Sequence, residues 1–348
     1  MKKILSVALA VVMLFAVVAL AGCGKKEAPL KFGLGVVANY GATKNADGEN
    51  NGEGEFNTTA VAVLLDAEGK IVKIDLDTAQ IKPTWTSEGK KVDVTDFRTK
   101  YDKGADYNMA TYGANMDKNG DGKVLEWNAQ ADAFMTTATG KTLAEVKAYM
   151  AEDGYATGDL ATAGCTIHVT DFVTALEKAV NSAVESTATA ENNLKVALVT
   201  SASHDNKDAT EEADGLNQVD TTVVAAVTDA EGKVVVAKTD CTQGKITFNA
   251  KGEATVDTTA AVKSKLEQGD DYNMATYGAN IDLNGDGKVL EWYAQAAEFD
   301  KALVGKKAAD FAAFADDKGY GTGDLATAGC TIAVADMVAA AVAAATVA

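Results

Sequence analysis

A stretch of ten residues, GDLATAGCTI, occurs twice in the chain, at residues 158–167 and 323–332. Because glycine has no Cβ, a glycine in such a turn allows backbone N–H groups to face an anion. A helix expected directly after each copy adds the positive end of its dipole, which favours a phosphate. The pattern therefore indicates a phosphate site beside a threonine hydroxyl, and a simple glycine turn into a helix is the alternative. The residues concerned are Gly164, Cys165 and Thr166, and in the second copy Gly329, Cys330 and Thr331.

Further strings recur in the same order, which indicates that the whole unit is duplicated. Residues 58–80 match residues 221–243, DYNMATYGAN recurs after 165 positions, and so does NGDGKVLEW. Core packing alone tolerates many substitutions, so repeated polar strings favour a duplicated site. We therefore expect one domain at residues 31–188 and a second at residues 189–348.

The elements that would position this site can be read from the pattern. Each half opens with two strands around an Asp-Ala-Glu-Gly-Lys turn, whose glycine supplies a positive φ. A helical segment is expected over residues 124–150, and a final helix over 169–184 that begins at Thr170 and Asp171. Residues 185–193 are expected to form a linker or a helix tail. Strands followed by helices favour an α+β fold, with two tandem copies of a mainly antiparallel sheet packed with helices.

The composition limits the classes of function. With 348 residues, 47% apolar and 24% charged, the chain can form a packed core. Its net charge of −18 repels nucleic acids and anionic lipid head groups, so nucleic-acid binding is not expected. The two histidines, His168 and His204, are not related by the repeat, which excludes a histidine-based triad in both halves.

The N-terminus has the pattern of a secretory signal. Residues 1–22 contain two lysines and then an apolar run, and they end in Leu-Ala-Gly before Cys23. This ending resembles the bacterial lipobox, which implies that Cys23 is lipidated and that two acyl chains anchor the protein outside the cell. Residues 23–30 would be a short tether of roughly 25 Å when extended. A plain transmembrane anchor is the alternative.

The order of hairpin, Glu-Trp, Gly-Lys and Asp-x-x-Thr-Ala-Gly-Cys-Thr-Ile before a final helix resembles a known family. It is similar to the covalent FMN-binding domain of extracellular flavin lipoproteins in Gram-positive electron-transfer systems. The same domain type occurs in the FMN subunits of sodium-pumping quinone reductases and Rnf complexes. The resemblance implies that a flavin transferase joins one FMN to Thr166 and one to Thr331 through phosphoester bonds. Cysteine stands where the family usually has alanine, and Asp159 and Asp324 lie one residue further from the threonine.

The resemblance and the repeats also suggest which residues surround each flavin. Because isoalloxazine is flat and apolar with a polar edge, repeated aromatic and methionine residues suit it. Packing in the core is the alternative for the aromatic residues, and a solvated helix position is the alternative for the glutamates. The candidates are Tyr107, Met109, Glu126, Trp127 and Ala163, with their counterparts Tyr272, Met274, Glu291, Trp292 and Ala328.

Two smaller expectations concern thiols and calcium. Cys165 and Cys330 are expected to be small buried thiols rather than redox groups, Cys241 has no counterpart, and no functional disulfide is predicted. Two Asp-x-Asn-x-Asp-Gly strings begin like a calcium loop but lack the closing bidentate glutamate at position twelve, so a plain Asx turn is the alternative. The oxygen ligands would be Asp117, Asn119 and Asp121, and Asp282, Asn284 and Asp286.

The sequence therefore predicts a lipid-anchored electron carrier rather than an enzyme with its own substrate. Two FMN groups would accept electrons from a quinone-linked dehydrogenase in the membrane and pass them to ferric iron, soluble flavin or a partner reductase. A calcium-stabilised surface binding or adhesion lipoprotein is the second hypothesis. A solute-binding lipoprotein ranks third, because that class has two different lobes rather than two copies of one domain.

Overall fold

The computed structural model describes residues 29–109, 124–274 and 290–346. Two antiparallel sheets dominate it, with strand orders β4-β3-β1-β7 and β10-β9-β8, and a small third sheet has the order β2-β5-β6. The first sheet contains β1 (Lys31–Tyr40), β3 (Phe56–Leu65), β4 (Ile71–Ile81) and β7 (Val184–Glu185). The second contains β8 (Asn193–Ala202), β9 (Gly215–Thr228) and β10 (Val234–Phe248), and the third β2 (Gly52–Glu53), β5 (Thr84–Trp85) and β6 (Lys91–Val92).

The predicted hairpins are confirmed in both halves. The Asp66 amide donates to the Lys70 carbonyl at 3.0 Å between β3 and β4, and Gly69 has a φ of 77°. The second turn, between β9 and β10, has the same geometry. The Asp229 amide donates to the Lys233 carbonyl at 2.9 Å, and Gly232 has a φ of 76°. Only glycine adopts such a φ without strain, which explains why this turn string is kept in both copies.

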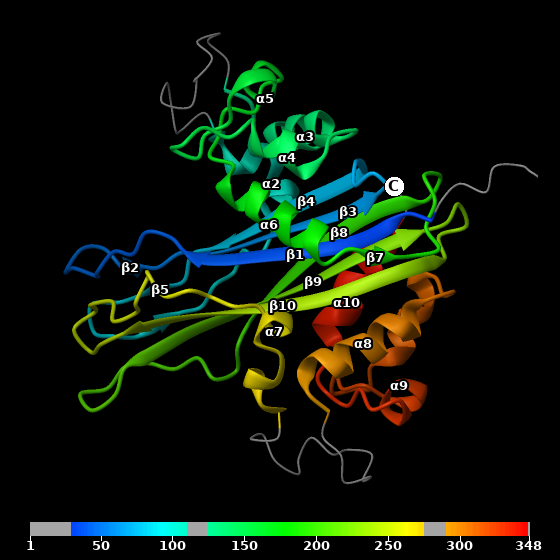
Figure 1. The fold of residues 1–348 in the computed structure, drawn as a ribbon. Coiled ribbons are helices and arrows are strands. Elements are labelled where there is room, and N and C mark those ends of the chain that lie inside the picture. Colours follow the sequence, from blue (N-terminus) through cyan, green and yellow to red (C-terminus); the bar gives the residue numbers. More distant parts are fainter. Residues whose placement is uncertain (1–28, 110–123, 275–289, 347–348) are drawn as a thin grey trace, which may run out of the picture.

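The two large sheets pack face to face, and helices cover both outer faces (Figure 1). On β3, Val61, Val63 and Leu65 face the first helical layer, whereas Ala60 and Leu64 face the second sheet. The central strands are therefore buried on both sides, which requires apolar residues at successive positions. The molecule has four layers in the order helices, sheet, sheet, helices.

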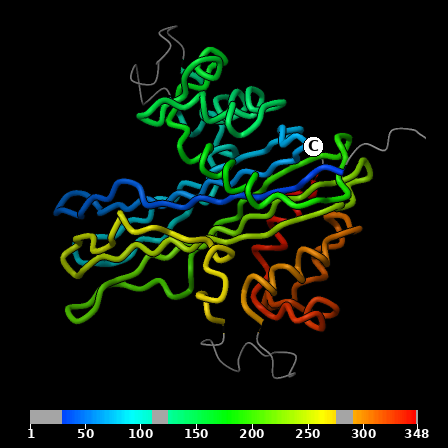
Figure 2. The backbone as a smooth tube through the Cα atoms, in the orientation of Figure 1, coloured from blue at the N-terminus to red at the C-terminus, as the bar shows by residue number. Residues whose placement is uncertain are grey.

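The helices follow the same order in each half. Those of the first half are α2 (Lys100–Lys103), α3 (Trp127–Ala138), α4 (Leu143–Lys147), α5 (Gly158–Thr162) and α6 (Thr170–Asn181), with a 3₁₀ turn η1 (Gly104–Tyr107). Those of the second are α7 (Lys265–Gln268), α8 (Trp292–Leu303), α9 (Gly323–Thr327) and α10 (Ala335–Ala345), with 3₁₀ segments η3 (Gly269–Tyr272) and η6 (Ala308–Phe314). The backbone trace shows the two helical groups on opposite sides of the double sheet (Figure 2).

Two expected helices differ from the structure. The single helix over 124–150 is wrong, because α3 ends before Gly140, whose φ is 80°, and α4 begins afterwards with a capping box between Thr142 and Glu145. The final helix ends at Asn181 rather than at residue 184. Ser182 donates to the Leu34 carbonyl on β1, and the chain then enters β7.

The two halves share one core. A buried layer between the sheets combines Phe32 and Leu64 of the first half with Val223 and Ala225 of the second. The structure is thus a mixed α+β fold with antiparallel sheets, in which the repeats are joined along a common apolar face. The expected boundary at residues 188 and 189 lies between β7 and β8.

The expected signal segment, Cys23 and most of the tether lie outside the described residues. Within the part of the chain that is described, no helix has both the length and the apolar character needed to cross a bilayer.

Candidate functional site

The repeated threonine lies beside a buried glutamine on the neighbouring helix. Gln130 of α3 accepts a hydrogen bond from the Thr166 amide at 2.8 Å, and its side-chain amide donates to the Leu125 carbonyl at 2.8 Å. Gln295 of α8 makes the same two bonds, to the Thr331 amide at 2.9 Å and the Leu290 carbonyl at 2.8 Å. Each glutamine is fully buried and bonded at both ends, as buried amides must be.

Both threonine side chains are buried. The exposed fraction is 3% for Thr166 and 5% for Thr331. The Thr166 hydroxyl lies 3.4 Å from the Gln130 carbonyl oxygen, and the Thr331 hydroxyl lies 3.5 Å from that of Gln295. A reagent that reaches either hydroxyl must therefore first separate it from its glutamine.

The expected amide cradle for a phosphate is wrong. The Gly164 amide donates to Ala161 at 3.0 Å and the Cys165 amide donates to Leu160 at 3.2 Å, so both close the end of α5. This pair of bonds, with glycine at a φ of 101°, is a Schellman motif, in which amides bond back to the helix they follow. The second copy has the same bonds, from Gly329 to Ala326 and from Cys330 to Leu325.

The expected start of α6 at Thr170 is confirmed, but it places the helix dipole away from the threonine. Three residues separate Thr166 from the first turn of α6. Gly164 precedes α6 in the sequence, but its conformation serves the end of the preceding helix, α5. A Cβ at Gly164 would lie 2.7 Å from Cδ1 of Leu125, an exposed side chain that can shift, so the positive φ is the main reason for glycine here.

The repeated glutamates tie the 3₁₀ turn to the start of the next helix. Glu126 precedes α3 as its N-cap residue and accepts a hydrogen bond from the Met109 amide at 3.0 Å. Glu291 does the same for the Met274 amide at 2.9 Å. Both methionine side chains are buried in the apolar cores below the helices. The glutamates thus have a structural contact and are not simply solvated positions.

The structure adds a lysine that the sequence analysis did not select. The Lys100 ammonium lies 5.1 Å from the Tyr107 ring centroid and 5.7 Å from the Trp127 ring centroid. The corresponding distances from Lys265 are 5.0 Å to Tyr272 and 5.4 Å to Trp292. These are cation–π distances, so each half brings one cation, one tyrosine and one tryptophan together.

The two lysines differ in their electrostatics. Burial lowers the pKa of Lys100 to about 8. The pKa of Lys265 is raised, because its interactions with Cys241, Tyr272 and Asp220 outweigh the burial that would lower it. Cys241 occupies the position of Thr78 on the equivalent strand, so this substitution changes the surroundings of one lysine only.

A repeated lysine seven positions before the repeated tyrosine was the available signal. The surrounding segments are TKYDKGADY and SKLEQGDDY, where the lysine is kept although most neighbours change. Each lysine lies on a short helix whose first turn is held by a carboxylate from the sheet. Asp77 accepts from the Tyr101 amide at 3.2 Å, and Asp240 accepts from the Leu266 amide at 3.1 Å.

The aromatic residues also serve the core. Trp127 is buried and its ring meets that of Phe172 on α6 edge to face, with centroids 5.7 Å apart. The Tyr107 hydroxyl donates to the Gln80 side chain at 3.2 Å on β4. Trp127 therefore packs in the core and also lies near the lysine.

The three described cysteines are buried free thiols. Burial raises the pKa of Cys165 and that of Cys330 to about 12, and it raises the pKa of Cys241 to about 11. A thiol with such a pKa stays protonated at neutral pH and is a poor nucleophile. This is the behaviour expected of a small buried residue in the place of alanine.

The expected calcium ligands lie outside the described residues. Asp117, Asn119, Asp121, Asp282, Asn284 and Asp286 all fall in residues 110–123 or 275–289. Within the described ranges, no group of three or more histidine, cysteine, aspartate or glutamate side chains is arranged to hold a metal ion.

Comparison with known proteins gives no relative: no family model, no curated protein and no solved structure matches the chain. The chemistry must therefore be argued from the site alone. Its aromatic rings and ammonium group suit a flat aromatic ring system such as a flavin. A phosphate would need donors other than the Gly164 and Cys165 amides, which are already bonded within the turn.

Proposed function

We propose that the protein is a lipid-anchored extracellular electron carrier with one FMN in each half. The observation that carries the proposal is the repetition of two groups of contacts at matching distances in both halves. One is the threonine amide with its buried glutamine, and the other is the lysine ammonium with its tyrosine and tryptophan rings. A packed core does not require identical polar contacts twice, whereas two equal cofactor sites do.

In this proposal the flavin supplies reversible electron storage, and the protein supplies attachment, burial and electrostatics. Thr166 and Thr331 would retain the cofactor through its phosphate. Lys100 and Lys265 would place positive charge against the ring, which favours the reduced, more negative flavin. The buried thiols of Cys165 and Cys330 would stay protonated and take no part in electron transfer.

The proposal has one structural requirement. Because Thr166 is 3% exposed and bonded through its amide to Gln130, the flavin transferase must act on a form in which this contact is open. The acceptors proposed for the electrons remain ferric iron, soluble flavin or a partner reductase, and the proposed donor remains a quinone-linked dehydrogenase.

The second candidate is a surface binding or adhesion lipoprotein without a redox role. Burial of both threonine hydroxyls favours it, as does the Schellman motif, which gives the repeated decapeptide a purely structural use. In that case the protein carries no flavin and the repeated cluster is part of each core.

The experiment that separates the two candidates is co-expression of the full chain with a flavin transferase, followed by mass spectrometry and an absorbance spectrum of the denatured, washed protein. The proposal expects two FMN adducts, of which Thr166→Ala and Thr331→Ala each remove one. Thr162→Ala and Thr327→Ala are matched controls, because these hydroxyls lie four residues earlier and donate to Gly158 and Gly323. A colourless, unmodified wild-type protein from the native organism overturns the proposal.

A further inference from the structure

The duplication creates two equivalent pockets where the halves meet. Strand β4 lies against β8, and its counterpart β10 lies against β1, so the sheets are related by an approximate two-fold axis. A pocket of about 600 Å³ lies at the first crossing and one of about 350 Å³ at the second. The two pockets differ in the charged side chains that line them.

In the smaller pocket the chain supplies its own ammonium group. The Lys178 ammonium of α6 lies 2.5 Å from a Glu267 carboxylate oxygen and donates to the Val36 carbonyl at 2.8 Å. Lys238 of β10 lines the same pocket, and with Lys178 it balances the carboxylates of Asp240 and Glu267. This crossing is therefore charge-neutral among its lining residues.

The larger pocket keeps the anionic partners and lacks these lysines. Asp102 stands in place of Glu267, since each lies five residues before the repeated tyrosine. Ala343 stands in place of Lys178, since each lies twelve residues after the repeated threonine. Asp75 stands in place of Lys238, so a carboxylate replaces the second ammonium group of the smaller pocket.

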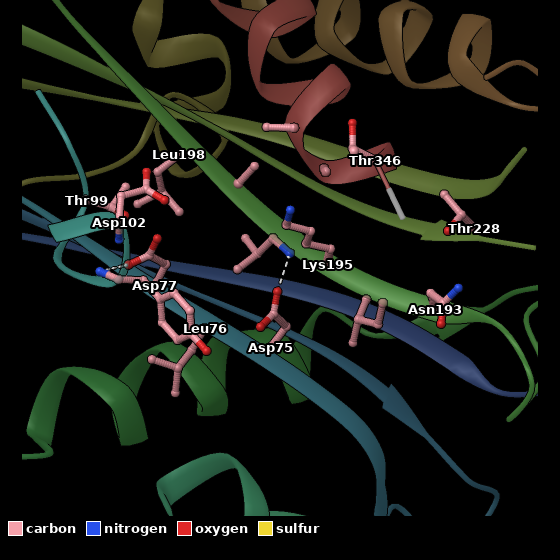
Figure 3. A pocket seen from close by; sticks show the side chains of 16 residues that line it. Asp75, Leu76, Asp77, Thr99, Asp102, Asn193, Lys195, Leu198, Thr228 and Thr346 are labelled. Carbon is pink, nitrogen blue, oxygen red and sulfur yellow. Dashed lines mark hydrogen bonds between the residues drawn. The ribbon is translucent and has the colours of Figure 1, made fainter. Parts of the chain in front are cut away.

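The lining of the larger pocket is accordingly acidic. Three carboxylates line it, those of Asp75 and Asp77 on β4 and of the exposed Asp102 on α2 (Figure 3). One lysine lines it, Lys195 of β8, which is also exposed. Leu198 also lines the larger pocket, and its position on β8 corresponds to that of Val36 on β1 in the smaller pocket. Burial raises the pKa of Asp75 to about 6 and that of Asp77 to about 7, because removal from water disfavours the charged form.

We propose that the larger pocket binds a small aliphatic amine, whose primary ammonium takes the place that Lys178 occupies in the equivalent pocket. The pairing of an ammonium with a carboxylate and a backbone carbonyl is the arrangement observed at Lys178, Glu267 and Val36. The volume of about 600 Å³ exceeds the need of one ammonium and accommodates a diamine. This inference does not depend on the proposed flavin.

The test is calorimetric titration of the full chain with 1,4-diaminobutane at pH 7.5 and low salt. Ala343→Lys copies the lysine of the equivalent pocket and is expected to weaken binding by at least about tenfold, by filling the site and adding repulsion. Ala339→Lys is the matched control, because it adds the same charge to an exposed position of α10 and should leave the affinity unchanged.

A second variant keeps the test valid if Ala343→Lys fails to fold. Asp102→Asn removes the carboxylate that corresponds to Glu267 and is expected to weaken binding by roughly tenfold or more, as for loss of a charged hydrogen bond. Absence of saturable binding to the wild-type chain, or equal weakening by Ala343→Lys and Ala339→Lys, overturns the proposal. Saturation by calcium or magnesium without any response to the diamine also overturns it.

Discussion

Thr58 on β3 and Thr242 on β10 meet across the two sheets, with their hydroxyl oxygens 2.7 Å apart. Both side chains are buried, so this is a polar contact inside the shared core. The bond joins the halves beside a second buried threonine pair, because Thr242 is in register with Thr221, whose hydroxyl bonds to that of Thr200. It therefore offers a direct measure of how strongly the repeats are coupled.

Replacing one partner of this pair should cost more than replacing both. Thr58→Val or Thr242→Val leaves a buried hydroxyl without its partner and is expected to lower the free energy of unfolding by about 1–3 kcal/mol. The double variant removes both hydroxyls and should recover part of that loss. Urea denaturation of the four proteins gives the coupling energy; additive losses would show that the contact contributes nothing.

Alanine at Gly164 should be more destabilising than alanine at Gly140. Both glycines have a positive φ, which costs an L-residue roughly 1–2 kcal/mol. At Gly164 the added Cβ would also lie 2.7 Å from Leu125 Cδ1, so this exposed side chain must shift, which adds a small cost. At Gly140 nothing lies within 4 Å of the added Cβ. Thermal unfolding should show a lower Tm for Gly164→Ala, and equal Tm values would argue against the contact.

Loss of the buried glutamine should destabilise either half in the same way. Gln130→Leu removes the hydrogen bonds to the Thr166 amide and the Leu125 carbonyl, at an expected cost of about 2–4 kcal/mol for the two bonds together. Gln295→Leu should cost a similar amount, because its bonds to Thr331 and Leu290 have nearly the same lengths. Denaturant midpoints of the two variants are the measurement, and a large difference would contradict equivalent sites.

The stability of the wild-type protein should fall as the pH rises through the weakly acidic range, in part because of Asp240. Burial raises the pKa of Asp240 to about 6 in the folded protein, above its ordinary value of 3.8. The stability it contributes is fully present below pH 3.8 and is lost as the pH rises to about 6. The loss is at most about 3 kcal/mol for a shift of this size.

Asp240→Asn tests this pH dependence. The amides of Cys241 and Leu266 both donate to one oxygen, Oδ1, which asparagine retains. The variant should show a smaller fall in unfolding free energy between about pH 4 and pH 6 than the wild type. Asp317→Asn, at an exposed turn position, is the control and should follow the wild-type profile. Parallel profiles for all three proteins would contradict the assignment to Asp240.

The local elements of this fold could be predicted because short-range physics determines them. The turns at Asp66 and Asp229 need glycine for its positive φ, and the strands beside them follow from β-branched residues. The helix break at Gly140 was missed because helical periodicity continues on both sides of it. The glycine was the signal, together with the capping pair Thr142 and Glu145.

The face-to-face packing of the sheets could also have been inferred, but from another feature. Ala60 to Leu65 form an unbroken apolar run, which indicates burial on both faces of a strand rather than on one. A repeated sequence directs attention to two separate domains, although repeats also pack against each other. Lys100 was missed because its contact with the Trp127 ring joins two segments that are separate in the sequence.

The repeated decapeptide fits two local structures equally well. Glycine before a helix predicts amides that face an anion, but glycine after a helix predicts a Schellman ending, and Gly164 lies between α5 and α6. The sequence alone does not separate the two cases. The hydrogen bonds from the Gly164 and Cys165 amides back to α5 show that the Schellman ending is the correct one.

The four-layer arrangement gives each repeat its own outward surface while the inner surfaces constrain one another. Substitutions on the outward faces of the helices of one repeat leave the other repeat unchanged. A change between the sheets, or where Lys178 of α6 pairs with Glu267 of α7, must be matched across the interface. After a duplication, the two outer helical surfaces of such a molecule can therefore change independently. Residue pairs that covary should be concentrated between the two sheets rather than on the outer helical surfaces.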